Sequence, residues 1–442
     1  MALFKNDVSE FVTPGTMDPA RLVVTIVPDA RDPDRHEVTA QVDDDGLIAT
    51  GSFVVSPEWR SQGTRPTTSK IYPAEPNRAR IGTQLFSALF SGALSRCWAQ
   101  AVERGRERGG LHIVIRSTSY AVQALPWELL TDPTLTSASQ YVPMSEGWSV
   151  IRDHTDPDAD APPRPAASAA PLTPGEVRIL ALTSPSSGVI QTNDPAILGS
   201  AFPDADLRTI ENVRPNQLTA ALELDDAHLV HLLGTGRRAR QGWQDLVVGS
   251  LDRPEVVSGT ILSKILRASS SVRLVVLAAC DSDQLAAQLA TSVPAVIGIR
   301  GAISDPSCLA FLGGFYAALG SGSTVAQAVA SGRSQQIAFA SSLSDEWAQP
   351  VLFQTADRQL VRPTSAGDEP AAPAIEDTTE DASGTHTPQE RVRLLEHTIK
   401  QANLRALHEQ WDPVEASDTP AFVHQQIDDL TAAVSPASGA AR

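Results

Sequence analysis

The chain has 442 residues, 42% of them apolar, and a formal net charge of −17. This length and apolar content suffice for a large core and more than one domain, whereas the acidity disfavours a nucleic-acid-binding protein, because phosphate backbones are bound through basic surfaces. Three cysteines, an odd and small number, argue against a disulfide framework.

The start of the chain lacks the basic and then apolar layout of a signal peptide, and no apolar run approaches the roughly twenty residues that a membrane span needs. We therefore expect a cytoplasmic protein without membrane contact.

Three apolar alternations near the N-terminus predict strands at residues 21–27, 38–42 and 47–55, separated by turn sequences. We interpret them as a β-meander within a β-rich segment, residues 1–75, that packs on the body of the protein. Residues 82–108 then show the helical spacing of apolar side chains that is typical of a helix packed on a sheet.

A strand at residues 111–116 leads to a short turn with the sequence LPWELL. Trp127 and Glu128 in this turn could be mistaken for a functional site. We favour a structural role, with a buried indole beside a hydrogen-bonded carboxylate. Residues 153–175 are rich in proline, alanine and aspartate and predict an exposed loop inside the domain.

From residue 176 onward, strands and helices alternate with short connections, which predicts a parallel sheet with right-handed crossovers and helices on both faces. The expected elements are a strand at 177–183, a helix at 216–224, a strand at 227–233, a helix at 256–268, a strand at 272–279, a helix at 283–291, a strand at 295–299, helices at 306–319 and 324–339, and a strand at 350–354.

The C-terminal region has two parts. Residues 361–388 consist mainly of Pro, Ala, Asp, Glu and Thr, and we expect a disordered acidic linker. Residues 389–436 contain two amphipathic stretches, which predict a helical hairpin on that tether. Because two such helices cannot bury both apolar faces alone, we expect the hairpin to bind a protein partner; docking onto the same chain is the alternative.

The strongest functional signal lies where two predicted buried strands end. The run SVRLVVLAACD stops at Cys280, and the preceding strand, AHLVHLL, stops at the step Gly234-Thr235-Gly236. Because open α/β sheets present functional groups beyond the carboxyl ends of their strands, we expect both ends to line one cleft. The expected cleft-lining residues are Gly234, Gly236, Arg237, Arg238, Asp281 and Ser282.

The two arginines would give the cleft a cationic rim, which suits an acidic peptide or a phosphate-bearing ligand and would lower the pKa of a nearby thiol. Binding of a nucleotide or another small ligand at the Gly-Thr-Gly step is a further alternative, because its backbone N–H groups can hold an anion. The spacing, however, matches neither a phosphate loop nor a dinucleotide fingerprint. We expect no cofactor and no metal.

Six segments resemble the CHAT domain, a bacterial branch of the caspase-like cysteine peptidases. In order, they are LPWELL (125–130), HLLGTG (231–236), LAACDSD (277–283), VPAVIGIRGA (293–302), FLGGFYAAL (311–319) and WAQPVLF (347–353). The resemblance implies a CHAT domain over residues 76–360 with an α/β, caspase-like fold, a mostly parallel sheet flanked by helices. The β-meander would precede it and the short helical module would follow it.

The resemblance also places Cys280 at the nucleophile position of the family and Thr235 at the position of its catalytic histidine. An imidazole eases ionisation of the thiol and later donates a proton to the leaving amine, and a threonine hydroxyl does neither. We therefore expect a CHAT-like pseudo-peptidase, a binding or regulatory component of a bacterial defence or death-type multi-protein system, with a peptide as a candidate ligand of the cleft. The alternative is an active cysteine peptidase in which Cys280 uses a non-standard base or is activated by a partner.

For the other histidines and cysteines, the sequence indicates either a structural role or no role. His231 lies roughly 13 Å before Thr235 at the rise of a strand, and we expect it to be a half-buried residue that bonds the sheet or a helix. Cys97 and Cys308 lie in apolar helical settings and are expected in the core. His228 lies upstream in the same strand as His231. The sequence does not place His112, His154 or His386 relative to Cys280.

Overall fold

The structure is a computed structural model that describes residues 18–362 with gaps. The gaps are residues 30, 33, 45, 57–58, 60–77, 136–140, 145–146, 155–169, 185–187, 225, 239–243, 251–252, 302, 340–345 and 356–357. At residues 78, 188–194, 224, 235, 237–238, 244, 249–250 and 253–254 the backbone alone is described. The predicted hairpin at 389–436, nearly all of the linker at 361–388 and most of the loop at 153–175 lie outside the described residues.

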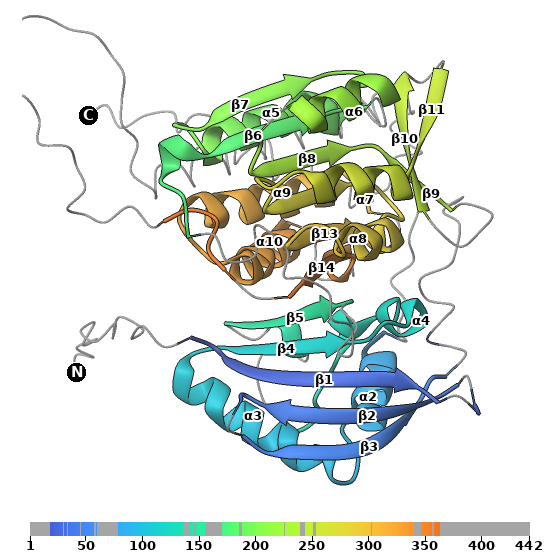
Figure 1. Ribbon diagram of the computed structural model, residues 1–442. Helices are drawn as coiled ribbons and strands as arrows, with labels where there is room; N and C mark the ends of the chain where they lie inside the picture. The colour runs from blue at the N-terminus through green and yellow to red at the C-terminus, as the bar shows by residue number, and fades with distance from the viewer. Residues whose placement is uncertain are drawn as a thin grey trace, which may run out of the picture.

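One eleven-stranded sheet runs through the molecule (Figure 1). In spatial order its strands are β3 (Ile48–Val54), β2 (Arg35–Val42), β1 (Ala20–Pro28), β4 (Leu111–Arg116), β5 (Trp148–Asp153), β14 (Pro350–Gln354), β13 (Ala295–Ile299), β12 (Leu274–Ala278), β8 (Leu229–Leu233), β6 (Arg178–Leu182) and β7 (Asp206–Ile210). Most neighbours are parallel, while β1–β2, β2–β3 and β13–β14 are antiparallel. The predicted α/β fold with a mostly parallel sheet is confirmed.

The sheet has two halves, a first from β3 to β5 and a second from β14 to β7. Helices cover both faces of the second half. They are α5 (Gly188–Ala201), α6 (Pro215–Leu224), α7 (Gly259–Ala268), α8 (Asp283–Leu289), α9 (Asp305–Gly320) and α10 (Val325–Phe339). Along β6, Ile179 and Ala181 join the core under α5, α9 and α10, whereas Leu180 and Leu182 join the core under α6, α7 and α8. Because both faces are covered, these strands read as continuous apolar runs.

The three N-terminal strands were predicted, and they extend the same sheet because β1 pairs in parallel with β4. Burial alternates along β1 and β2, since one face packs under α2 (Arg78–Leu89) and α3 (Leu94–Arg108). The single helix predicted at 82–108 is wrong. It is two helices that turn at Gly92, whose φ of +57° lies in the left-handed region that favours glycine.

The helix predicted at 256–268 begins only at Gly259. The β-branched pair Val256 and Val257 belongs instead to β11 (Arg253–Ser258), and Ser258 caps α7 by accepting the N–H of Thr260 at 3.3 Å. β11 forms a separate three-stranded sheet with β10 (Gln244–Ser250) and β9 (Thr235–Arg238). This small sheet, β5, β7 and α5 were not predicted from the sequence.

Candidate functional site

Cys280 lies two residues beyond β12, in the turn that leads into α8. This turn is bonded to the end of the neighbouring strand β13: the N–H of Ser282 donates to the Ile299 carbonyl at 2.8 Å, and the N–H of Ile299 donates to the Ser282 hydroxyl at 2.9 Å. Asp281 has a φ of +55°, and its N–H donates to the Gly301 carbonyl at 2.8 Å. The backbone around the thiol is therefore fixed by the sheet.

The step after β8 contacts the same turn. The N–H of Gly236 donates to the carbonyl of Cys280 at 3.0 Å. A Cβ at Gly236 would lie 2.5 Å from the Asp281 carbonyl oxygen and 2.7 Å from that of Cys280, so glycine permits this approach. The structure thus places the ends of β8 and β12 against each other.

Backbone alone is described for Thr235, Arg237 and Arg238, so the predicted cationic rim lies outside the described side chains. Their backbone forms β9, in which Thr235 pairs with Val247 of β10. The N–H of Gly236 is already bonded to Cys280, which leaves this N–H unavailable for the anion cradle considered as an alternative.

The Cys280 thiol has an apolar and acidic setting. The side chain is partly buried, and its sulfur donates to the carbonyl of Ile303 at 3.7 Å. Burial is the main cause that raises the pKa of the thiol above its ordinary value. The hydrogen bond to Ile303 opposes this shift, and the carboxylates of Asp281, Asp305 and Glu346 add smaller contributions that raise the pKa. This setting favours the protonated thiol at neutral pH.

His231 is fully buried and stands opposite Val276 in the β8–β12 register. That position is four residues before Cys280, about 13 Å along the strand. Its Nδ1 lies 2.7 Å from the Tyr316 hydroxyl of α9. The prediction that His231 bonds a helix is confirmed, and the half-buried state expected for it is wrong because α9 covers this face.

None of the five histidines in the described part of the chain is hydrogen-bonded to the Cys280 sulfur. His228 lies at the amino end of β8, where its Nδ1 accepts the N–H of Arg178 at 3.2 Å. His154 follows β5, three strands from β12, which corresponds to roughly 14 Å. His112 and His36 lie on strands still farther away, β4 and β2. His386, His397, His408 and His424 lie outside the described residues.

The turn LPWELL (residues 125–130) is structural in the described fold. The Trp127 indole is buried and donates to the Val122 carbonyl at 2.9 Å. The fully buried Glu128 carboxylate accepts hydrogen bonds from both terminal nitrogens of Arg152. Its Oε1 lies 3.6 Å from Nη2 of Arg333. The prediction of a buried indole beside a hydrogen-bonded carboxylate is confirmed.

Sequence reasoning missed the polar groups that join the two halves of the sheet. Arg152 of β5 and Arg333 of α10 flank Glu128, and the Tyr120 hydroxyl of α4 (Tyr120–Gln123) donates to the Asp283 carboxylate at 2.7 Å. Burial raises the pKa of Asp283, although the Tyr120 bond and nearby arginines oppose this shift. The sequence signal that could have indicated these contacts is Arg152, which follows apolar residues in WSVIRD. A buried arginine in a strand requires an acidic partner.

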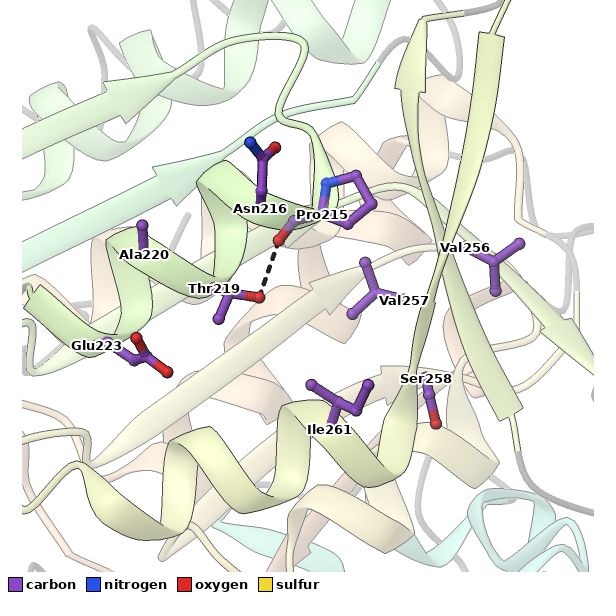
Figure 2. Close-up of a pocket in the computed structure, with 9 residues that line it drawn as sticks. All are labelled: Pro215, Asn216, Thr219, Ala220, Glu223, Val256, Val257, Ser258 and Ile261. Atoms are coloured by element: carbon purple, nitrogen blue, oxygen red, sulfur yellow. Dashed lines mark hydrogen bonds between the residues drawn. The ribbon is translucent and has the colours of Figure 1, made fainter.

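A groove of about 380 Å³ lies elsewhere, between α6, β11 and α7 (Figure 2). Its lining residues are Pro215, Asn216, Thr219, Ala220, Glu223, Val256, Val257, Ser258 and Ile261. None of them belongs to the turn around Cys280, so this groove is separate from the predicted cleft. Within the described ranges, no group of histidine, cysteine and acidic residues is arranged to hold a metal ion, and no helix has the length and apolarity for a membrane span.

A model of the CHAT domain family matches residues 79–357, well over half of the chain. A search of curated proteins gave no match. Among solved structures, the chain is similar to Saccharomyces cerevisiae separase in its complex with securin, with a TM-score of 0.44 and 10% sequence identity. The similarity covers 76% of this chain and 30% of the separase chain, so this chain spans less than a third of that protein.

Proposed function

Because this chain belongs to the CHAT domain family, we propose that it is a CHAT-type pseudo-peptidase, which binds or regulates other proteins instead of cutting them. The observation that carries the proposal is the setting of Cys280. Its sulfur donates to a carbonyl, burial and the charges of nearby acids raise the pKa of its thiol, and the described histidines are bonded or placed elsewhere. The resemblance of HLLGTG to the family's motif supports the proposal further, because it assigns Thr235 to the position of the histidine.

The chemistry follows from this setting. A thiol attacks a carbonyl as thiolate, and a raised pKa keeps the thiolate fraction low at neutral pH. Expulsion of the amine further needs a proton donor, a role that the threonine hydroxyl in place of an imidazole does not fill. In the proposed role, the cleft at the ends of β8 and β12 holds a peptide without cleaving it, and residues 389–436 bind a protein partner of a bacterial defence or death-type system.

Labelling by a peptidyl electrophile tests this proposal. We expect a peptidyl acyloxymethyl ketone to leave Cys280 unlabelled at neutral pH, with the Cys280→Ala chain as the background. Thr235→His should add labelling, and the pair Thr235→His with Cys280→Ala should lose it again. Strong labelling of the unchanged chain that disappears in Cys280→Ala would refute the pseudo-peptidase.

An active cysteine peptidase with an unusual base is the second candidate. It is favoured by one contact, the hydrogen bond from Gly236 to the Cys280 carbonyl, which holds the two strand ends together. In this case the base would come from a partner or from His386, His397, His408 or His424. If the base is one of these four histidines, replacing them by asparagine in the full chain would abolish Cys280-dependent cleavage. If a partner supplies the base, cleavage would survive this change and would require the partner, whereas a pseudo-peptidase shows no Cys280-dependent cleavage in either case.

A further inference from the structure

We propose that two copies of this chain associate through β3, which pairs antiparallel with β3 of the second copy and joins the two sheets into one. This association is independent of whether Cys280 is reactive.

β3 is the last strand of the eleven-stranded sheet and pairs on one side only, with β2 (Figure 1). Within the described ranges, no strand occupies its outer edge. Alternate residues of such an edge direct their N–H and C=O groups outward, where a further strand can bond them.

β3 lacks the features that protect edge strands. Its sequence, IATGSFV, contains no charged residue and no proline. The other sheet edges do contain them: β7 has Asp206 and Arg208, β9 has Arg237, and β11 has Pro254. Charges and prolines at an edge oppose the addition of another strand, so β3 is the edge that remains open to it.

A second copy of β3 is a suitable partner for this strand, because residues at equal distances on either side of Gly51 have similar side chains. In a symmetric antiparallel pair centred on Gly51, Ile48 stands opposite Val54, Ala49 opposite Phe53, and Thr50 opposite Ser52. Apolar residues therefore meet apolar residues and hydroxyls meet hydroxyls, the pairings that stabilise neighbouring strands.

Exposure supports this register. Ile48 is 59% exposed and Val54 is 57% exposed, and each would cover the other in the second copy. A two-fold axis through Gly51 and perpendicular to the sheet keeps α2 and α3 on the same face in both copies. The same symmetric arrangement at β7 would place Arg208 opposite itself, and like charges at that position oppose self-pairing.

The mass of the full chain in solution tests the association. Light scattering after size exclusion should give twice the 46.9 kDa of one chain at tens of micromolar. Thr50→Lys combined with Ser52→Lys sets lysine opposite lysine in this register and should weaken association at least about a hundredfold. Thr39→Lys, at an exposed position of β2 beside Thr50 on the same face, should leave the dimer intact.

Charge reversal tests the register itself. A chain with Thr50→Glu and Ser52→Glu should also be monomeric, and mixing it with the double-lysine chain should restore a dimer, with folding of both checked by circular dichroism. A monomeric unchanged chain, a dimer that survives the double-lysine change, or a mixture that stays monomeric would each overturn the proposal.

Discussion

At the scale of single residues, Cys280 combines a backbone fixed by hydrogen bonds with a thiol whose pKa is raised. Its backbone is held by β13 and by Gly236, yet burial and, to a smaller extent, the charges of three acids raise the pKa of its thiol. The backbone at Cys280 is therefore fixed, while the environment of its side chain disfavours the thiolate.

This environment predicts the pH dependence of alkylation. The rate at which iodoacetamide modifies Cys280 should still rise with pH beyond about 8.5, where a free cysteine is half ionised, because burial and carboxylates raise the pKa of its thiol. Mass spectrometry gives the rate site by site, and the buried Cys97 and Cys308 should stay unmodified in the folded protein. A rate that is already constant at neutral pH would show that the thiol is activated.

His228 predicts a loss of stability in mild acid. Burial, together with Arg178 and Arg273, lowers the pKa of His228 from 6.5 to about 4 in the folded protein. The unfolded chain then takes up a proton first, so the contribution of neutral His228 to stability is present above pH 6.5 and is lost as the pH falls to about 4.

Urea unfolding at several pH values measures this effect. His228→Asn keeps an acceptor for the Arg178 N–H but does not titrate, so its free energy of unfolding should fall less than that of the unchanged chain across this pH range. Parallel curves for the two proteins would exclude His228 as the group responsible.

At the scale of elements, the close approach of β9 to the Cys280 turn predicts a glycine-specific effect. Gly236→Ala would bring a methyl group to 2.5 Å from the Asp281 carbonyl oxygen, so the two segments must separate, and we expect a loss of roughly 1–3 kcal/mol in unfolding free energy. Gly199→Ala is the matched control. Its Cβ would meet nothing closer than 3.9 Å inside α5, and it should raise stability by about 0.5–1 kcal/mol. Equal effects of the two changes would contradict the contact.

The elements that the sequence predicted are those with the clearest periodicity. Apolar runs identified β6, β8, β12 and β13, because strands covered on both faces need no polar residue. β5 was missed because Arg152 and Asp153, both buried in ionic contacts, interrupt its run. β7 was missed because an edge strand with Asp206 and Arg208 resembles a loop, and α5 because Pro195 lies inside it.

The candidate site was located from the ends of two strands, but its electrostatics could not be predicted. Asp305 and Glu346 lie far from Cys280 in the sequence, and only the tertiary structure brings their charges near the thiol. The setting of His231 likewise depends on Tyr316, which α9 contributes from another part of the chain.

At the scale of the whole molecule, the two halves of the sheet meet at β5 and β14. These strands share one register pair, Arg152 with Phe353, whereas β4 and β5 share six. Polar contacts supplement this narrow junction: Glu128 with Arg152 and Arg333, and Tyr120 with Asp283.

Glu128 should therefore matter more to stability than an exposed acid. Glu128→Gln leaves Arg152 and Arg333 buried without their counter-charge and should cost about 3–5 kcal/mol in unfolding free energy at pH 7. The control Glu223→Gln, on the exposed side of α6, should change it by less than about 0.5 kcal/mol.

The stabilisation that Glu128 provides should decrease in acid. Burial alone would raise the pKa of Glu128, but Arg152 and the other arginines outweigh it and lower the pKa. The stabilisation is thus complete above the ordinary glutamate value and disappears as the pH falls through the lowered value of the folded state. The difference between the unchanged chain and Glu128→Gln should shrink accordingly in acid, and a difference that persists unchanged would rule out ionisation as its source.

The place of β14 has a consequence for biosynthesis. This strand is the last of the sheet to be translated, yet it inserts between β13 and β5, near the middle of the strand order. A nascent chain that has not yet exposed residues 350–354 outside the ribosome carries two unjoined half-sheets, each with an open inner edge that other polypeptides could bond. Completion of the native molecule is therefore a late step, and ribosome-bound intermediates should depend on chaperones until it occurs.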